Sequence, residues 1–390
     1  MEFGLSDQQR LLVDTVRQFI WRELYPLEDE VERAGRLEPA DAQRIFEASR
    51  ALGLYAMNIP EAYGGGGLST LDWMLVEEQF GQASDILVRR AFGNVYEILI
   101  EGTPLQHERW LRPSVKGERT FSIAFTEPDA GSDAAGIKTS ARRDGDGWVI
   151  NGNKHYISDA HFSDFFVFTA RTEQQGDAGG ISTFIVDKGT PGFEVGPDQP
   201  MMGLRGTSHA ELSFNDVRLG AEHLLGPEGG GLKLALTTLG RVRLAQIGAR
   251  AVGKATRLLD LALAHAGERK QFGQAIGDFQ MVQAMLADSA VEIGAARLAL
   301  LQTAWMIDQG HDARHHISAV KLQASETLGR VADRVVQIFG GSGYSKELSI
   351  ERYYRDARIY RIYDGTSEIH RTVIARGLLG GDRSLYALEE

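Results

Sequence analysis

The sequence of 390 residues predicts a multidomain α+β protein in which a β domain lies between two α-helical domains. Apolar residues recur at helical spacing in the first and last parts of the chain, whereas the middle holds short runs of aromatic and β-branched residues. Glycine-rich turns separate the middle from the last part. We expect an N-terminal α-helical domain at 1–118, a middle antiparallel β-barrel or sandwich domain at 119–231, and a C-terminal four-helix-bundle domain at 232–390.

The first helix is predicted from its start signal. Ser6 and Gln9 form the S-x-x-Q pattern of a capping box, and Leu12, Val16 and Phe19 follow at steps of four and three. Further helices are predicted over 40–52, 70–82 and 86–101.

The strands of the middle domain are predicted from five short runs bounded by Gly, Asp, Asn or Pro. These runs are FSIAFTE, GWVINGNKHYIS, DFFVFTART, ISTFIVDK and HAELSFNDV. The segment RDGDGWVING carries a hairpin-type turn. The domain is expected to end near LGPEGGG, residues 225–231.

The last part of the chain returns to long helices rich in Ala and Leu. Two apolar faces consist of Val282, Leu286, Ile293 and Leu300, and of Val320, Ala324, Leu328, Val331, Val335 and Ile338. Such helices pack as a bundle.

Composition excludes several classes of function. The net charge of -11 argues against a nucleic-acid partner, and the absence of cysteine excludes disulfides, thiolate metal sites and cysteine nucleophiles. The ten histidines lack metal-ligand spacing, so no metal is expected. The first residues do not read as a signal peptide, and no apolar run approaches the roughly 20 residues of a membrane span. We expect a cytoplasmic protein without a membrane partner.

Nucleotide-binding motifs are incomplete. GARAVGKA, from Gly248, nearly matches a phosphate-binding loop, but Ala255 replaces the required hydroxyl residue and no strand precedes it. No G-x-G-x-x-G occurs, so a Rossmann site lacks its fingerprint.

Two motifs leave more than one interpretation open. TEPDAGSD, residues 126–133, is either an ordinary turn or a ligand loop that offers hydroxyl groups and backbone N–H groups. In RIYDGTSEIHR, Asp364 precedes Gly365 just before a helix start, where it is either a solvated turn acid or a carboxylate base held in a rigid turn.

The order of the motifs indicates a family. TEPDAGSD, HYIS, MGLRGTSHAELSFNDV, ERKQFG, QIFGGSGY and RIYDGTSEIHR follow one another along the chain. From about residue 3 to 380 this resembles the acyl-CoA dehydrogenase family of flavoproteins. The resemblance implies the same three domains, a homotetramer, non-covalent FAD between the β domain and the bundle, an acyl-CoA substrate and an electron-transfer flavoprotein or similar acceptor.

The resemblance also assigns site residues. Those expected to bind FAD are Phe125, Thr126, Ser132, Tyr156, Ser158, Arg269, Phe272, Gln280, Gln337, Gly340, Gly341, Thr366 and Glu368. Five of these would serve the FAD of an adjacent subunit: Arg269, Phe272, Gln337, Gly340 and Gly341. Substrate-binding roles fall to Ser132, Arg243 and Gly365. The family usually has Trp and Thr where this chain has Tyr156 and Ser158.

Asp364 is the catalytic residue that the resemblance implies. In the family, the acid before Gly-Thr removes the α-proton of an acyl thioester while the β-hydrogen leaves as hydride to flavin N5. Most members carry glutamate there, and aspartate is shorter by one methylene. Either the substrate α-carbon or the turn itself is therefore expected to be displaced relative to typical members. Aspartate at this position resembles the branch that oxidises alicyclic carboxyl thioesters, and also some long-chain and hydroxyacyl-type members, so an alicyclic or otherwise non-standard acyl group is expected.

Three alternatives stay open. The thioester could belong to an acyl-carrier protein, because Leu244 falls where relatives often have a CoA-binding arginine, with Arg243 beside it. A nitroalkane-oxidase-like flavin oxidase also uses an aspartate base. A non-catalytic, DNA-associated module is disfavoured by the end of the chain, GDRSLYALEE, which is not basic.

Overall fold

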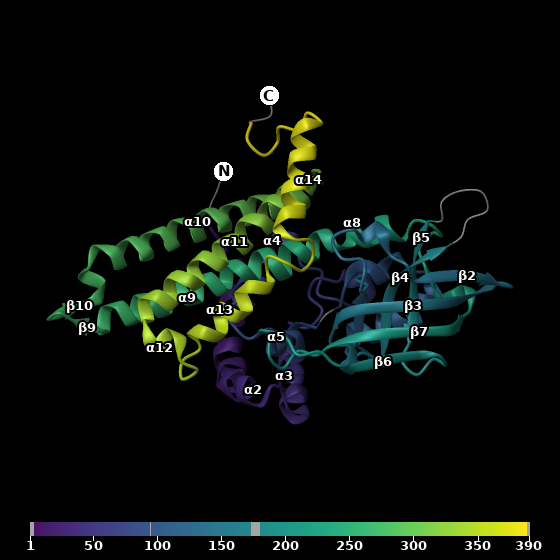
Figure 1. Ribbon diagram of the computed structural model, residues 1–390, viewed down its shortest axis with the longest axis horizontal. Helices are drawn as coiled ribbons and strands as arrows, with labels where there is room; N and C mark the ends of the chain where they lie inside the picture. The colour runs from purple at the N-terminus through teal and green to yellow at the C-terminus, as the bar shows by residue number, and fades with distance from the viewer. Residues whose placement is uncertain (1–3, 94, 173–179, 388–390) are drawn as a thin grey trace.

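The computed structural model describes residues 4–93, 95–172 and 180–387, so the outer limits expected for the first and last domains lie outside the described residues. Long helices pack side by side on one side of the molecule and a twisted sheet forms the other, with α8 extending between them (Figure 1). The short helices α2, α3 and α5 lie below the junction in this view. We keep the division at 118/119 and 231/232 as a proposal.

Helices form the first part of the chain. Their bounds are α1 (Asp7–Phe19), α2 (Glu28–Ala34), α3 (Pro39–Ala51), α4 (Thr70–Phe80), α5 (Asp85–Phe92), α6 (Pro104–Gln106) and α7 (Arg112–Lys116). The capping box at Ser6 is confirmed, since the Gln9 N–H donates to Ser6 Oγ at 3.2 Å and the Ser6 N–H donates to Gln9 Oε1 at 3.0 Å. The single helix predicted over 86–101 is wrong. α5 ends before Gly93, whose φ of +80° breaks the helix, and a 3₁₀ turn (Glu97–Glu101) follows.

The middle of the chain forms a sheet in the order β6-β7-β3-β2-β4-β5-β8, with β1 also paired to β4. Its strands are β1 (Phe121–Ala124), β2 (Ser140–Asp144), β3 (Gly147–Ser158), β4 (Phe165–Thr172), β5 (Ile181–Asp187), β6 (Phe193–Asp198), β7 (His209–Leu219) and β8 (Leu224–Leu225). The predicted hairpin joins β2 to β3, where Asp144 pairs with Gly147. Most pairs are antiparallel as expected, but β1 and β2 each run parallel to β4, because loops rather than tight turns bring them there.

The last part is the bundle. Its helices are α8 (Gly231–Val242), α9 (Arg250–Glu268), α10 (Gln280–Asp308), α11 (Arg314–Phe339), α12 (Gly341–Tyr344), α13 (Ile350–Ile359) and α14 (Ser367–Leu379). A π-helical segment, η9 (Arg243–Ala249), joins α8 to α9 without a break, and a small hairpin of β9 (Lys270–Gln271) and β10 (Gln274–Ala275) follows α9. π-Helical segments inside α-helices are frequent at functional sites.

The two helical parts share one hydrophobic core although the sheet separates them in sequence. Trp73 of α4 belongs to the same buried cluster as Leu300 of α10 and Leu328 of α11. The sheet has its own aromatic core. In the GARAVGKA segment Lys254 is buried within α9, where its Nζ donates to Ala83 O at 3.1 Å, so this lysine is part of the packing and does not face a phosphate site.

Candidate active site

The turn between α13 and α14 carries the predicted base. Asp364 has a φ of +51°, which is uncommon for a residue with a side chain, and Gly365 has a φ of +93°. A Cβ on Gly365 would lie 2.9 Å from His370 Nε2. Glycine is therefore required at 365, and the backbone at 364 is held in a strained conformation of the kind found at functional sites.

Three side chains from three elements hold this turn, and we call them the turn clamp: Arg243, Lys321 and His370. Arg243 Nε, at the start of η9, donates to Asp364 O at 2.9 Å. His370 Nε2, on α14, lies 3.2 Å from the same oxygen, and Lys321 Nζ, on α11, donates to Gly365 O at 2.5 Å. The backbone of the base is thus fixed from the bundle, from α14 and from the helix that runs toward the sheet.

Burial lowers the pKa values of all three side chains of the turn clamp. It lowers the pKa of His370 to about 4, helped by the neighbouring charge of Lys321, so this imidazole is neutral at pH 7. Because its partner is a carbonyl oxygen, Nε2 carries the proton and donates it. Burial also lowers the pKa of Lys321 to about 8 and lowers that of Arg243, although Asp364 opposes both shifts.

The carboxylate and the backbone N–H of Asp364 make no hydrogen bond or ion pair within the described residues. The residue is half-buried. A carboxylate without a partner, on a backbone held by three donors, is suited to accept a proton from a ligand.

Tyr96 connects this turn to the sheet. Its ring packs edge-on against Phe121 of β1, with the centroids 5.7 Å apart. Burial raises the pKa of Tyr96, Arg89 opposes the rise and Asp364 adds to it, so the phenol, Arg89 and the base interact electrostatically. Tyr96 therefore packs on the start of β1 and interacts electrostatically with the turn.

Four predicted cofactor residues meet at that sheet, and we call them the strand patch: Phe125, Thr126, Tyr156 and Ser158. The His155 N–H donates to Thr126 O at 2.8 Å, which joins the loop after β1 to β3. Tyr156 has a φ of +58° and is 56% exposed, and Ser158 lies two residues further along the same strand. An exposed ring beside hydroxyl groups is what a flat aromatic ligand needs.

The TEPDAGSD loop is held by a buried ion pair. Lys154 Nζ lies 2.7 Å from Glu127 Oε1, and both side chains are buried. The Glu127 carboxylate also accepts from the backbone N–H groups of Lys138 and Thr139, at 2.6 and 3.1 Å. Ser132 lies exposed further along this loop. The loop is thus a rigid rim beside the strand patch.

A second group of predicted residues lies at the far end of the bundle, and we call it the bundle tip: Arg269, Phe272, Gln337, Gly340 and Gly341. His265, just before Arg269, stacks on Phe339, just after Gln337, with ring centroids 4.1 Å apart. Phe272 is 93% exposed. Gly340 adopts φ +60° and ψ −136°, a conformation essentially confined to glycine, and a Cβ on either tip glycine would meet no atom within 4 Å.

The tip and the turn do not meet within one chain. Lys321 of the clamp and Gln337 of the tip lie on the same helix α11, and their numbers differ by 16, so they are about 24 Å apart along the axis at 1.5 Å per residue. Gln280, the first residue of α10, is also exposed.

The two remaining predicted cofactor residues lie at the start of α14. The Thr366 hydroxyl accepts from the Ile369 N–H at 3.2 Å and so caps the helix. Glu368 is exposed.

The residues present fit FAD. The strand patch offers an exposed ring with hydroxyl groups for the flavin, and the tip offers an arginine fork and open glycine backbone for a diphosphate. Among the described residues no cluster of His, Asp and Glu could hold a metal ion. In the same parts of the chain no helix has the length and apolar character to cross a membrane.

Four residues of the site were not predicted: Lys321, His370, Tyr96 and Glu127. Lys321 had a signal, because it lies on the apolar face of its helix beside Val320 and Ala324, where a lysine needs a polar partner. His370 and Tyr96 had none, since their partners are backbone atoms or residues distant in sequence.

Three family models match the chain in order. Residues 6–118 match the acyl-CoA dehydrogenase N-terminal domain, residues 122–217 the middle domain, and residues 229–379 the C-terminal domain.

Full-length relatives and solved structures agree with these matches. The probable acyl-CoA dehydrogenase YngJ of Bacillus subtilis is 39% identical and is covered over 100% of its length by 97% of this chain. The structure of butyryl-CoA dehydrogenase from Megasphaera elsdenii superposes with a TM-score of 0.88 at 33% identity, over 97% of this chain and 100% of that one. A chain in the study of the electron transferring flavoprotein of Acidaminococcus fermentans gives a TM-score of 0.90 at 34% identity, with the same two coverages.

Proposed function

Since the chain belongs to the acyl-CoA dehydrogenase family of FAD-dependent oxidoreductases, we propose that it removes the α- and β-hydrogens of a compact acyl-CoA thioester, with Asp364 as the base. The observation that carries this assignment is the Asp364 carboxylate, which lacks a partner within the described residues while three donors hold the backbone around it.

The residues divide the work of the reaction. The Asp364 carboxylate takes the proton as the α C–H bond breaks, and the α,β double bond forms from the electrons of that bond. When bound, FAD accepts the β-hydrogen with its electron pair. In this proposal the N–H of Asp364, which has no acceptor within the described residues, donates to the thioester carbonyl and so makes the α-proton more acidic. The turn clamp keeps the N–H and the carboxylate in fixed relation, and a misplacement of about 1 Å can cost roughly a hundredfold in rate.

The other predicted residues have binding roles in this proposal. The strand patch packs on the flavin, Ser132 and Gly365 contact the thioester, and Thr366 and Glu368 lie at a helix start that favours negative charge. Arg243 acts on the turn rather than on the substrate alone, since its Nε is bound to Asp364 O. The bundle tip and Gln280 serve the FAD of an adjacent subunit in a homotetramer.

The electron acceptor and the thioester carrier are proposed from the similar proteins. An electron-transferring flavoprotein is the proposed acceptor, supported by the similarity to a chain from the study of such a protein. CoA is the preferred carrier over an acyl-carrier protein, because butyryl-CoA is the substrate named for a similar structure. We also propose the cytoplasmic location that the sequence predicts.

Anaerobic flavin reduction tests the proposal. The FAD-loaded protein is mixed with cyclohexanecarboxyl-CoA, cyclohexenecarboxyl-CoA and linear thioesters of increasing length, and the loss of flavin absorbance is followed. We expect reduction by one or more thioesters, fastest with the compact rings. Reduction by none of them, with oxygen consumed instead in the presence of nitroalkanes, would favour the oxidase alternative. A preference for long straight chains would remove the alicyclic hypothesis and leave the dehydrogenase in place.

A further inference from the structure

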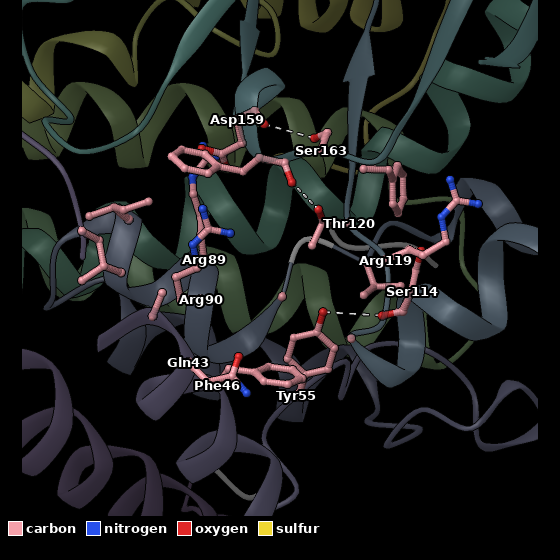
Figure 2. Close-up of a pocket in the computed structure, with 18 of the residues that line it drawn as sticks. Gln43, Phe46, Tyr55, Arg89, Arg90, Ser114, Arg119, Thr120, Asp159 and Ser163 are labelled. Carbon is pink, nitrogen blue, oxygen red and sulfur yellow. Dashed lines mark hydrogen bonds and ion pairs between the residues drawn. The ribbon is translucent and has the colours of Figure 1, made fainter. Parts of the chain in front are cut away.

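A cavity of about 350 Å³ lies between α3, α5 and the sheet, apart from the Asp364 turn. Arg89 and Arg90 form one side and Arg119 and Ser114 the opposite side, with Asp159 and Ser163 above and Phe46 and Tyr55 below (Figure 2). Val95 also lines the cavity. The charge of Asp364 contributes to the raised pKa of the next residue, Tyr96. Tyr96 packs against Phe121, another residue of the cavity wall.

Two of the three arginines in this cavity are paired. Arg89 lies 2.6 Å from Asp159, and Arg119 lies 2.6 Å from Asp187. Arg90 has no hydrogen bond or ion pair within the described residues, and its guanidinium lies 4.6 Å from the centroid of the Phe162 ring. The cavity therefore contains one positive charge that no anion balances.

The surroundings of Arg90 make this imbalance costly. Burial lowers the pKa of Arg90, and the neighbouring Arg89 lowers it further, while Asp159 and Tyr55 raise it only in part. Much of the wall is apolar, with Leu37, Ile86 and Phe121 among the lining residues. Arg90 is half-buried, and a partly desolvated charge without a counter-ion gains free energy when an anion pairs with it. At about 30 Å³ per water molecule, the volume holds roughly ten waters, which is room for a small organic acid.

We propose that this cavity is a carboxylate-binding site, in which Arg90 binds the carboxylate group and the apolar wall contacts a short aliphatic chain. A guanidinium binds a carboxylate through two parallel hydrogen bonds, and the fork of Arg90 is free to do so. The carboxylate comes either from a free acid or from the far end of the acyl group of the substrate. Only the second source rests on the proposed function.

Binding of adipate tests the site without any catalytic readout. Sodium adipate, with sodium hexanoate for comparison, is titrated calorimetrically into the FAD-loaded wild type and into Arg90→Gln. The matched control is Arg33→Gln, which alters an exposed arginine with no hydrogen bond or ion pair within the described residues. We expect saturable binding by the wild type and the control, weakened at least tenfold in Arg90→Gln. Arg90→Lys, which keeps the charge but loses the fork, should lie between them and replaces Arg90→Gln if that variant does not fold.

Enzyme activity with two thioesters distinguishes a carboxylate on the acyl group from a free acid. If it belongs to the acyl group, the wild type has a higher kcat/KM for adipyl-CoA than for hexanoyl-CoA, and Arg90→Gln loses that preference. If it belongs to a free acid, adipate binds while the two thioesters react alike. Both outcomes support the site. Equal adipate binding and equal thioester preference in wild type and Arg90→Gln would overturn it, whatever the enzyme does with other thioesters.

Discussion

The turn at Asp364 and the bundle tip contain the same kinds of group, yet they are built in opposite ways. Each includes a glycine at positive φ and an arginine. At the turn, side chains from three elements hold the backbone, and all three are wholly or largely buried. At the tip, Phe272 is 93% exposed and the space beside Gly340 and Gly341 is open.

This difference indicates which part of the site one chain forms by itself. The proposed base needs a fixed position relative to the substrate, and the contacts that hold its turn within the described residues all come from one chain. The tip offers binding groups that face outward about 24 Å along α11 from the clamp, which suits a cofactor held partly by another subunit. Changes at the turn should therefore alter the rate of chemistry, and changes at the tip should alter cofactor retention.

The largest effect is expected at the base. Asp364→Asn keeps the shape of the side chain but removes the proton acceptor, and general-base catalysis contributes roughly 10²–10⁴-fold. Flavin reduction by the best thioester should slow by that factor while FAD stays bound. Asp364→Glu, which moves the carboxylate by one methylene, should cost roughly 10²-fold or less with compact substrates. Stopped-flow absorbance measures both rates, and a near wild-type rate in Asp364→Asn would exclude this residue as the base.

A smaller effect, of a different kind, is expected at the tip. Arg269→Gln removes an exposed guanidinium assigned to the FAD diphosphate, and a charged hydrogen bond is worth about 1.5–3 kcal/mol. FAD affinity should fall by about 10–100-fold, with the rate per bound FAD unchanged. Fluorescence titration of the apoprotein measures the affinity. Arg376→Gln, an exposed arginine at the end of α14, is the matched control. A slower reduction rate in fully loaded Arg269→Gln would show that the two regions are not separate.

The sequence predicted the two regions unequally for a physical reason. The turn and the capping box are local, so residue type and spacing indicate them, whereas the tip glycines were assigned by the resemblance to the family. The clamp is not local, since Lys321 and Arg243 reach the turn from helices far away in sequence, and only packing decides their rotamers. The same holds for the break at Gly93, where a helical apolar pattern ran across a glycine at positive φ that packs so closely on Tyr55 that a Cβ would lie 2.6 Å from its ring.

The smallest expected effect concerns the stability contributed by Lys321. Burial lowers its pKa to about 8 from the ordinary value of 10.5, so the folded protein loses this proton more readily than the unfolded chain does. Between these pH values the unfolded state binds more protons, and stability therefore rises with pH for this group. The free energy of unfolding of the wild type, relative to Lys321→Met, should increase by about 1–3 kcal/mol from pH 8 to pH 10.5 and change little between pH 7 and pH 8.

Urea unfolding of both proteins at a series of pH values measures this difference. Lys270→Met, which removes an exposed lysine at the bundle tip, is the control for the loss of one positive charge. Subtracting the variant removes the titration of groups that do not interact with Lys321. His370, whose pKa Lys321 lowers, titrates below pH 7 and so outside the range compared. A difference that stays constant from pH 7 to pH 10.5 would mean that water reaches Lys321 in solution. The turn would then resemble the tip, and the contrast between a dry, self-contained base and an open cofactor end would not hold.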